Sequence, residues 1–372
     1  MSEVGTLFVV FLLIYLAQCL WWTPPGASVF ALGTIGKGAR KKQGFVWHAL
    51  DLAGVLANPL PPLSPLVVSD WPGFQPEPDR FCHCPPAGAE PVSFPWETLA
   101  VTSSDSRLLC NGVPVLKAGE AQIQRCAEFL RRTAKLKRGR RERAIEAWLS
   151  RSTDQKAASQ ELEVFRRRSR WLRIITNVEF FLLFLIVPLA FRSLGTRALW
   201  PAVTALAAIA ISVTLEFWML HRALFPESSG ARMKSAVTIL LSPVAAVRAC
   251  DAVSKELLTG FHPLAVASVI LPDEEFKHFA SEQLRACRYG PASGGWYGAK
   301  LQKALESLIR QKGMQPEHLM SPSKQESNCV AYCPRCLAQY VNDRAECADC
   351  GYQELVVFPG TAGSRLIDGT GH

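Results

Sequence analysis

The sequence lacks the short motifs of the common nucleotide-dependent and hydrolytic enzymes. It contains no G-x-G-x-x-G or Walker loop, no H-E-x-x-H pair and no serine nucleophile elbow, and its seven histidines are scattered along the chain. These absences argue against the enzyme classes that those motifs mark, although they leave open an active site assembled from distant segments. The sequence therefore favours a protein without catalytic activity, and it offers no candidate catalytic residue.

The chain also lacks a disulfide framework. Of its twelve cysteines, four form two C-x-x-C pairs near the C-terminus, and the other eight show no regular spacing. Unpaired thiols are typical of a reducing cytoplasm rather than of a secreted scaffold. Cys82 and Cys84 form a C-x-C pair without the spacing of a metal knuckle. We expect a structural or incidental role for this pair, with a redox or second metal site as the alternative.

Charge is missing from the first long apolar stretch, residues 5–22. Its length is about enough to cross the hydrocarbon core of a bilayer. A signal peptide is the rival interpretation, but Glu3 is the only charged residue nearby and no A-x-A cleavage pattern follows. We therefore expect an uncleaved transmembrane helix, with Trp21 and Trp22 at the membrane interface.

Two further apolar stretches, residues 174–191 and 198–220, are joined by a short link. Together they predict a transmembrane helical hairpin over residues 174–220. Another stretch, residues 236–248, is short and contains Pro243. A buried or interfacial helix is therefore favoured there over a fourth span.

Basic residues flank these stretches on one side of the expected membrane. They are Lys37, Arg40, Lys41 and Lys42 after the first stretch, Arg166, Arg167, Arg168, Arg170 and Arg173 before the second, and Arg222, Arg232 and Lys234 after the third. The positive-inside rule then predicts a multi-pass protein of the inner membrane, with its N-terminus outside and its C-terminus in the cytoplasm.

Two acidic residues, Glu179 and Glu216, lie within the expected hairpin. An ionisable group inside a span suggests a functional role by default. Both lie toward the expected cytoplasmic ends, however, with Arg173 near the first and Arg222 near the second. The favoured interpretation is that each carboxylate pairs with a nearby base, and the alternative is a proton or cation site shared by the two helices.

Residues 44–118 are rich in proline, tryptophan and valine, and they hold three basic against seven acidic residues. Within them, Asn111 and Gly112 separate two strand-like segments. An Asn-Gly pair is a strong hairpin signal because a type I′ turn needs positive φ at both central positions. We expect a small β-rich cytoplasmic domain over these residues.

Residues 119–173 change to a helical composition without proline, and they hold sixteen basic and seven acidic residues. This excess equals the net charge of the whole chain, +9. The segment could be a juxtamembrane helix on anionic lipid headgroups, a nucleic-acid patch, or a solvated helix that obeys only the positive-inside rule. Continuity with the hairpin favours the first and third interpretations, and the scarcity of interleaved aromatic residues makes base stacking a poor fit.

Residues 231–313 are expected to form a helical cytoplasmic region. Leu301, Leu305 and Leu308 share one face of a helix that should stop at Gly313. That face is expected to belong to the core, with partner binding as the alternative. The polar residues 314–328 are expected to be a linker.

The strongest pattern is a set of four cysteines, Cys333, Cys336, Cys347 and Cys350, in which ten residues separate two C-x-x-C pairs. Each C-x-x-C turn directs two sulfurs at one metal ion, and two turns complete a tetrahedral site. We expect one structural Zn²⁺, because four thiolates leave no open position for water or substrate. Replacement of one ligand by Cys329 is a minor alternative.

Residues 332–358 resemble the short zinc ribbons found at the ends of many bacterial proteins. The first knuckle departs from the usual form because Leu337 stands where glycine is common. The resemblance implies a metal-stapled module over residues 329–360, too small to hold a core otherwise. Such a module either serves folding alone or also presents a recognition surface for protein or nucleic acid.

Together these segments predict a multi-span α-helical membrane protein with a small cytoplasmic β-rich domain, a basic helical segment and a C-terminal zinc ribbon. The favoured function is a non-enzymatic scaffold or regulator of the bacterial inner membrane that docks cytoplasmic partners. One alternative is a membrane transport or enzyme subunit that uses Glu179 and Glu216. Another is a membrane-tethered nucleic-acid binder.

Overall fold

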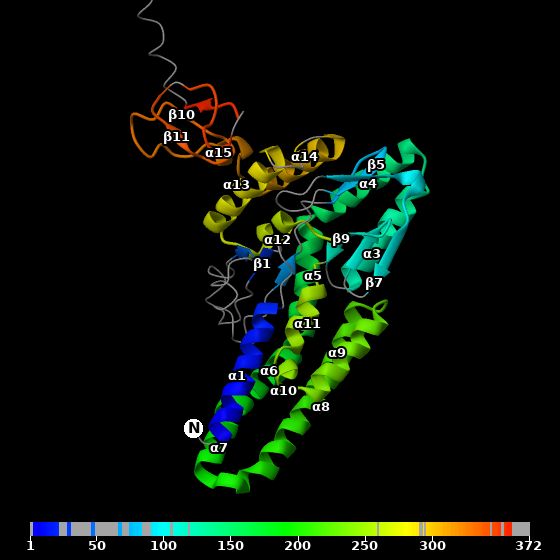
Figure 1. Ribbon diagram of the computed structural model, residues 1–372, viewed down its shortest axis with the longest axis vertical. Helices are drawn as coiled ribbons and strands as arrows, with labels where there is room; N and C mark the ends of the chain where they lie inside the picture. Colours follow the sequence, from blue (N-terminus) through cyan, green and yellow to red (C-terminus); the bar gives the residue numbers. More distant parts are fainter. Residues whose placement is uncertain are drawn as a thin grey trace, which may run out of the picture. The chain divides into compact units, whose positions relative to one another are not determined.

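The computed structural model describes most of the chain as two compact units, Met1–Glu275 and Phe276–His372 (Figure 1). The described residues are 3–21, 28–30, 46–48, 66–68, 74–83, 91–104, 107–117, 120–258, 260–289, 293, 295–342, 344–350 and 353–358. The apolar helices, the small sheets and the basic segment belong to the first unit, and the two C-x-x-C pairs belong to the second.

Within the described residues, one helical run, Arg170–Leu224, is long and apolar enough to cross a membrane. The prediction of a multi-span membrane protein is therefore wrong. The run consists of α6 (Arg170–Phe181), the π-helical stretch η4 (Leu182–Ile186), α7 (Val187–Leu194), the 3-10 turn η5 (Gly195–Ala198) and α8 (Leu199–Leu224). The link expected between two separate spans is itself helical, and the run bends there instead of being interrupted by a loop.

The run bends between α7 and α8 (Figure 1), and Gly195 in this stretch has a φ of +57°. A left-handed conformation at this position suits glycine, which has no Cβ to clash. As a result α6 and α8 pack against each other, and Figure 1 shows them as the green limbs of one bend.

The first apolar stretch forms the helix α1 (Glu3–Trp21), and Trp22 lies outside the described residues. One side chain of this helix, Tyr15, is buried, and its ring centroid lies 5.3 Å from that of Phe184 in the long run. Apolar composition over residues 5–22 therefore reflects, at least at Tyr15, packing within the protein.

The stretch 236–248 is divided between α9 (Ser229–Leu241) and α10 (Pro243–Val247). Ser242 leaves the helical conformation and its Oγ accepts a hydrogen bond from the Ala245 N–H at 3.3 Å, which starts the second helix. Val244 and Val247 are buried. Val237, Leu240 and Leu241 on α9 are exposed, so the stretch forms two short helices, of which only the second is largely buried, and not one continuous helix.

Three small antiparallel sheets of three strands lie in the first unit, with the orders β2-β1-β3, β4-β5-β6 and β7-β8-β9. Their strands are β1 (Ser28–Phe30), β2 (Val46–His48), β3 (Leu66–Val68), β4 (Phe74–Pro76), β5 (Arg80–His83), β6 (Val92–Pro95), β7 (Val101–Ser104), β8 (Arg107–Cys110) and β9 (Val113–Lys117). All but β1 fall within the expected β-rich region 44–118. A short 3-10 turn, η3 (Trp96–Thr98), follows β6.

The hairpin predicted at Asn111 and Gly112 is confirmed. The two residues connect β8 to β9 with φ angles of +49° and +81°, as a type I′ turn requires. The C-x-C pair is only partly described: Cys82 lies in β5, and Cys84 lies outside the described residues.

The basic segment forms the helices α3 (Glu120–Ala134), α4 (Arg138–Ser152) and α5 (Gln155–Arg168). It is not a free stalk. The rings of Phe129 and Trp148 stack with centroids 4.8 Å apart, and Trp148 also lies 5.7 Å from Phe74 of β4. The apolar sides of α3 and α4 therefore pack on the sheet β4-β5-β6, and α3 also contacts β7 and β8. Most of the cations are left on the remaining faces.

Two short helices complete the first unit, α11 (Ala249–Glu256) and α12 (Pro263–Ile270). The Glu256 carboxylate accepts a hydrogen bond from the Ala121 N–H at the start of α3, at 3.1 Å. The His262 N–H donates to the Ser152 carbonyl at 2.7 Å. These bonds join residues more than a hundred positions apart and tie the basic helices to the end of the unit.

The second unit begins within α13 (Asp273–Tyr289), at Phe276. It also contains α14 (Gly295–Gln311), α15 (Pro316–Met320) and the strands β10 (Ala331–Tyr332), β11 (Gln339–Tyr340) and β12 (Val356–Val357). Leu305 and Leu308 are buried, Leu301 is half-buried and Gly313 has a φ of +76°, so most of the predicted leucine face lies in the core. The expected linker 314–328 contains α15, because Met320 buries its side chain.

Candidate metal centre

The two C-x-x-C turns lie beside a small antiparallel sheet with the strand order β11-β10-β12. Cys333 directly follows β10, and its N–H donates to the Ala338 carbonyl while its own carbonyl accepts from the Leu337 N–H, both at 2.9 Å. These bonds close the first turn. Leu337 completes it with a φ of +64°, the left-handed conformation for which glycine is common.

The unfavourable backbone conformation of Leu337 is offset by the packing of its side chain. It packs against the apolar core of the ribbon, formed by Cys329, Tyr332 and Phe358. The rings of Tyr332 and Phe358 lie 4.9 Å apart. The departure from the usual zinc-ribbon sequence therefore exchanges backbone strain for apolar packing, and Cys329 is part of this core rather than of the sulfur group.

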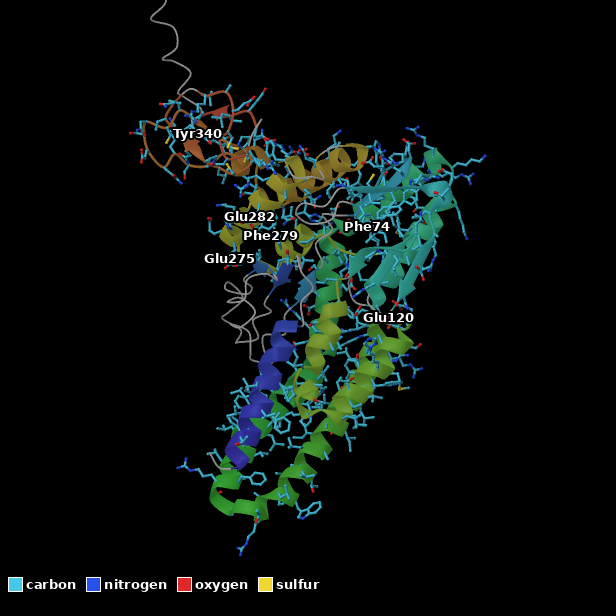
Figure 2. All side chains as sticks on the ribbon, viewed as in Figure 1. Phe74, Glu120, Glu275, Phe279, Glu282 and Tyr340 are labelled. Carbon is cyan, nitrogen blue, oxygen red and sulfur yellow. The ribbon has the colours of Figure 1, made fainter. Side chains whose placement is uncertain are left out.

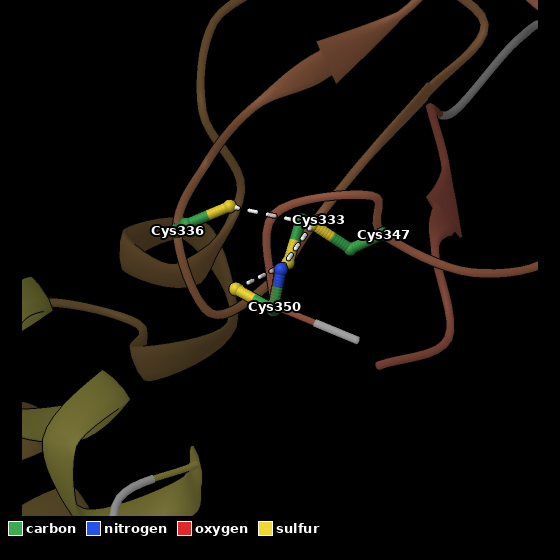
Figure 3. A group of neighbouring side chains, drawn as sticks. All are labelled: Cys333, Cys336, Cys347 and Cys350. Atoms are coloured by element: carbon green, nitrogen blue, oxygen red, sulfur yellow. Dashed lines mark hydrogen bonds between the residues drawn. The ribbon is translucent and has the colours of Figure 1, made fainter. Parts of the chain in front are cut away.

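The four sulfurs converge on one point (Figure 3). All four Sγ atoms lie within 4.8 Å of one another. Cys336 and Cys347 are separated by 3.6 Å, and Cys333 and Cys350 by 3.9 Å. Tetrahedral coordination with a metal–sulfur distance of about 2.3 Å places neighbouring sulfurs about 3.8 Å apart. The spacing therefore fits a four-thiolate metal site.

Burial differs among the four ligands. Cys333 and Cys347 are buried, Cys350 is half-buried and Cys336 is exposed. A metal held by all four sulfurs would have no vacant coordination position for water. Such a site can hold the two turns together, and Cys336 would be the ligand most open to solvent.

Tyr340 on β11 contacts the second turn. Its hydroxyl accepts a hydrogen bond from the Ala348 N–H at 3.2 Å and lies 3.2 Å from the Cys347 Sγ, to which it can donate. The Cys350 N–H also points at the same sulfur, at 3.4 Å. The hydrogen bond from Tyr340 is the main reason that the pKa of the Cys347 thiol falls to about 6, so this ligand is prepared to be a thiolate.

Sequence reasoning did not identify Tyr340. It lies four positions from Cys336 and seven from Cys347, and no metal-site spacing includes it. Its place is set by the pairing of β10 with β11, in which Tyr340 is opposite Ala331. This pairing allows a side chain on the strand next to the first turn to reach the second turn. The contact can therefore be recognised only when the strand pairing is known.

The two carboxylates singled out in the apolar region lie in different environments. Glu179 on α6 is fully buried, and neither of its oxygens has a hydrogen-bond partner in the described part of the chain. Glu216 on α8 is half-buried. The expected pairing of Glu179 with Arg173 is wrong, because Arg173 donates instead to the Arg166 carbonyl at 3.0 Å. A site shared by the two glutamates is not formed through hydrogen bonds either.

No family model matches the chain, and neither does any curated protein or solved structure.

Proposed function

We propose that this protein is a non-enzymatic adaptor at the bacterial inner membrane, and that its ribbon binds Zn²⁺ and docks a protein partner in the cytoplasm. The observation that carries the proposal is the cluster of four cysteine sulfurs. A closed thiolate site stabilises a fold and offers no reacting position. Zn²⁺ is the proposed metal because four thiolates at tetrahedral spacing suit it, with iron as the competitor.

A cytoplasmic location suits the exposed ligand Cys336, because a reducing compartment keeps an exposed thiol available to the metal. The proposed docking surface lies on the outer strands of the ribbon sheet. Val356 and Val357 on β12 are each 40% exposed, and Val341 directly after β11 is 50% exposed. Edge strands with exposed apolar side chains are suited to pairing with another chain.

A lipid bilayer is the partner proposed for the run Arg170–Leu224. Large apolar side chains lie exposed along it, and Trp200 has 76% of its surface accessible. Contiguous exposure of this kind indicates an interaction surface. Other members of the exposed set are Trp171, Phe181, Leu194, Leu215 and Met219. Exposed cations where the run begins, Arg167 and Arg170, suit anionic headgroups.

The metal is tested by elemental analysis of the purified full-length protein. We expect one zinc per chain in the wild type, and loss of that zinc in Cys333→Ser, which removes a buried ligand. Cys329→Ser is the matched control, because its sulfur lies in the apolar core and outside the metal group. Iron in place of zinc would change the proposed metal, and an absence of metal would overturn the proposal.

The docking surface is tested by photo-crosslinking in cells from position 357, with position 164 as the control. Val164 on α5 is also exposed, at 37%. We expect one dominant crosslinked protein from position 357, no equivalent product from position 164, and loss of the product in the Cys333→Ser background. Equal crosslinking from both positions would contradict a docking role for the ribbon.

A second candidate function is supported by Glu179 alone. Its carboxyl group is fully buried and has no hydrogen-bond partner among the residues that the structure describes. Such burial costs free energy, and groups that are retained despite this cost are often functional. The stretch η4, which begins three residues later, is a type of helix frequent at functional sites. Proton or cation flux in proteoliposomes that is lost in Glu179→Gln and kept in Glu216→Gln would support a transport role. No flux in the wild type would exclude it.

A further inference from the structure

The junction between α3 and α4 gathers five exposed cations in one place. We call this set the basic apex; it consists of Arg132, Lys135, Lys137, Arg140 and Arg143. Its members share one property besides charge: within the described residues, none of their side chains forms a hydrogen bond or an ion pair. Neighbouring cations behave differently, since Arg138 pairs with Asp79 at 3.2 Å and with Glu142 at 3.6 Å.

The basic apex is anchored to the rest of the first unit by Arg141, whose side chain is only 6% exposed. Its guanidinium donates to the Pro78 carbonyl at 2.8 Å and to the Leu136 carbonyl at 2.9 Å, and it lies 5.3 Å from the ring centroid of Trp96. Leu136 belongs to the junction itself. The backbone that carries the exposed cations is therefore fastened to the sheet β4-β5-β6 and the turn after it.

Two of the five cations, Lys137 and Arg140, lie at the start of α4, where the helix dipole disfavours positive charge, whereas Arg132 and Lys135 lie at the end of α3, where it favours positive charge. The residue that caps the start of α4 is Lys137, which provides no side-chain acceptor, and the first turn contains no acidic residue. Cations at this end repel the positive end of the helix dipole. By contrast, α5 begins with Asp154, whose carboxylate accepts from the Lys156 and Ala157 N–H groups. A local arrangement that opposes stability is expected where function requires it.

The composition of the apex fits a phosphate backbone better than a protein partner. Among the described residues between Val113 and Val164, no large apolar side chain is exposed. Protein interfaces need an apolar or aromatic centre, whereas nucleic-acid interfaces are polar and strongly positive. The nearby rings of Phe129 and Trp148 stack on each other, so they do not form a platform for unpaired bases.

Lipid headgroups at the ends of the apolar run are too far away to account for the apex. Arg125 on α3 lies 3.7 Å from Glu227, three residues beyond the end of α8. From Arg125, α3 continues nine residues to Ala134, about 14 Å at 1.5 Å per residue, and Figure 1 shows it leading away from α8. This separation exceeds the screening length of about 8 Å at physiological salt.

We propose that the basic apex binds the phosphate backbone of double-stranded nucleic acid without reading its sequence. The rigid junction presents the cations, and the absence of exposed apolar and stacking side chains restricts the contacts to phosphates. Side chains that contact only phosphates position a protein on a duplex but do not specify a base sequence.

The test is binding of a fluorescent DNA duplex to the full-length, detergent-solubilised protein at several salt concentrations. The apex variant carries Lys135→Gln, Lys137→Gln and Arg140→Gln. The control variant carries Lys156→Gln, Lys303→Gln and Arg151→Gln, which removes the same number and kinds of exposed cations elsewhere. Each lost phosphate contact lowers the slope of log affinity against log salt by about 0.9. We expect a loss of about 2 to 3 in that slope for the apex variant, and little change for the control.

Four results would overturn the proposal. The first is undetectable binding of the duplex by the wild type, and the second is an equal loss of binding in both variants. The third is competition by polyglutamate that is as strong as competition by unlabelled duplex at equal charge. The fourth is apex-dependent binding to anionic vesicles that exceeds binding to the duplex. The second result would show that binding depends on the net charge of the protein and not on the position of the cations. The third would assign the apex to an acidic protein, and the fourth would assign it to lipid.

Discussion

At the scale of single residues, the metal centre depends on a side chain that is not a ligand. Tyr340 places its hydroxyl 3.2 Å from the Cys347 sulfur and accepts the Ala348 N–H at the same distance. Groups of this kind orient a ligand and stabilise its charge, and their loss commonly weakens metal binding by about 10- to 100-fold. Tyr332 offers a natural comparison, because its hydroxyl contacts the Ser321 hydroxyl instead.

We therefore expect Tyr340→Phe to lower the affinity for zinc by about 10- to 100-fold, as measured by competition with a chelator of known affinity. Tyr332→Phe should leave the affinity within about threefold of the wild type, since no ligand loses a hydrogen bond. Substitution with cobalt provides an independent measurement, because only Tyr340→Phe should shift the thiolate-to-metal charge-transfer bands. Identical behaviour of the two variants would show that the Tyr340 contact does not affect the metal.

His262 makes the stability of the first unit depend on pH. It caps α12 by accepting the Leu264 N–H on Nδ1, at 3.1 Å. Burial lowers the pKa of this histidine from 6.5 to about 4. In the unfolded chain the ring gains its proton near pH 6.5, but in the folded protein it stays neutral down to about pH 4. The free energy of unfolding should therefore fall as the pH drops through this window.

We expect this loss to reach at most about 3 kcal/mol at pH 4, as measured by urea unfolding. His262→Asn keeps a side-chain acceptor at the cap but does not titrate. Between pH 7 and pH 4, the free energy of unfolding of this variant should therefore fall by about 3 kcal/mol less than that of the wild type. His262→Ala should lose about 1 kcal/mol at pH 7 as well. Burial raises the pKa of Asp251 to about 6, which gives the opposite slope, so the comparison between variants isolates the histidine. Parallel profiles for the wild type and His262→Asn would contradict the assignment.

At the scale of secondary-structure elements, glycines at two positions have opposite roles. Gly112 in the β8–β9 turn has a φ of +81°, whereas Gly139 lies in the first turn of α4, and a Cβ built on either residue meets nothing within 4 Å. Differences between them must therefore come from the backbone rather than from clashes.

Gly112→Ala should lower the free energy of unfolding by about 1 kcal/mol, because alanine is strained in the left-handed conformation. Gly139→Ala should raise it by up to about 1 kcal/mol, because alanine favours the helix. Urea unfolding of both variants measures the two changes. Changes of the same sign would mean that the turn or the helix differs from the described conformation.

At the scale of the whole molecule, the two units differ in what stabilises them. The first has an extensive apolar core, whereas residues 329–358 have a small cluster of Cys329, Tyr332 and Phe358 beside the four ligands. A segment of this size needs a metal or a similar staple to remain folded. The stability of the ribbon should therefore depend on the metal, and that of the first unit should not.

Removal of the metal by a chelator should abolish slow amide exchange in residues 329–358 and leave it unchanged in residues 120–258. Hydrogen-exchange mass spectrometry of the full-length protein measures both regions in one sample. Zinc added back in excess should restore protection. Loss of protection in both regions would indicate that the metal also stabilises the first unit, contrary to this expectation.

Several features of the protein follow from the sequence by itself. The C-x-x-C spacing determined which four sulfurs could converge, because each turn directs two of them to one point. Asn111 and Gly112 determined a hairpin, because few other residues accept two successive positive φ angles. The helical spacing of Leu305 and Leu308 indicated a buried helix face. Each of these signals is local, so neighbouring residues suffice to read it.

Other features were decided only by the tertiary structure. Apolar composition predicted separate spans, but whether helical conformation continues across a short link depends on backbone geometry that composition does not record, and Arg170–Leu224 forms one run. The contact of Tyr340 with Cys347 depends on strand pairing. The division of the basic segment into packed cations such as Arg141 and exposed ones such as Arg140 depends on which helix face meets the sheets. Contacts between residues far apart in the chain determine all three.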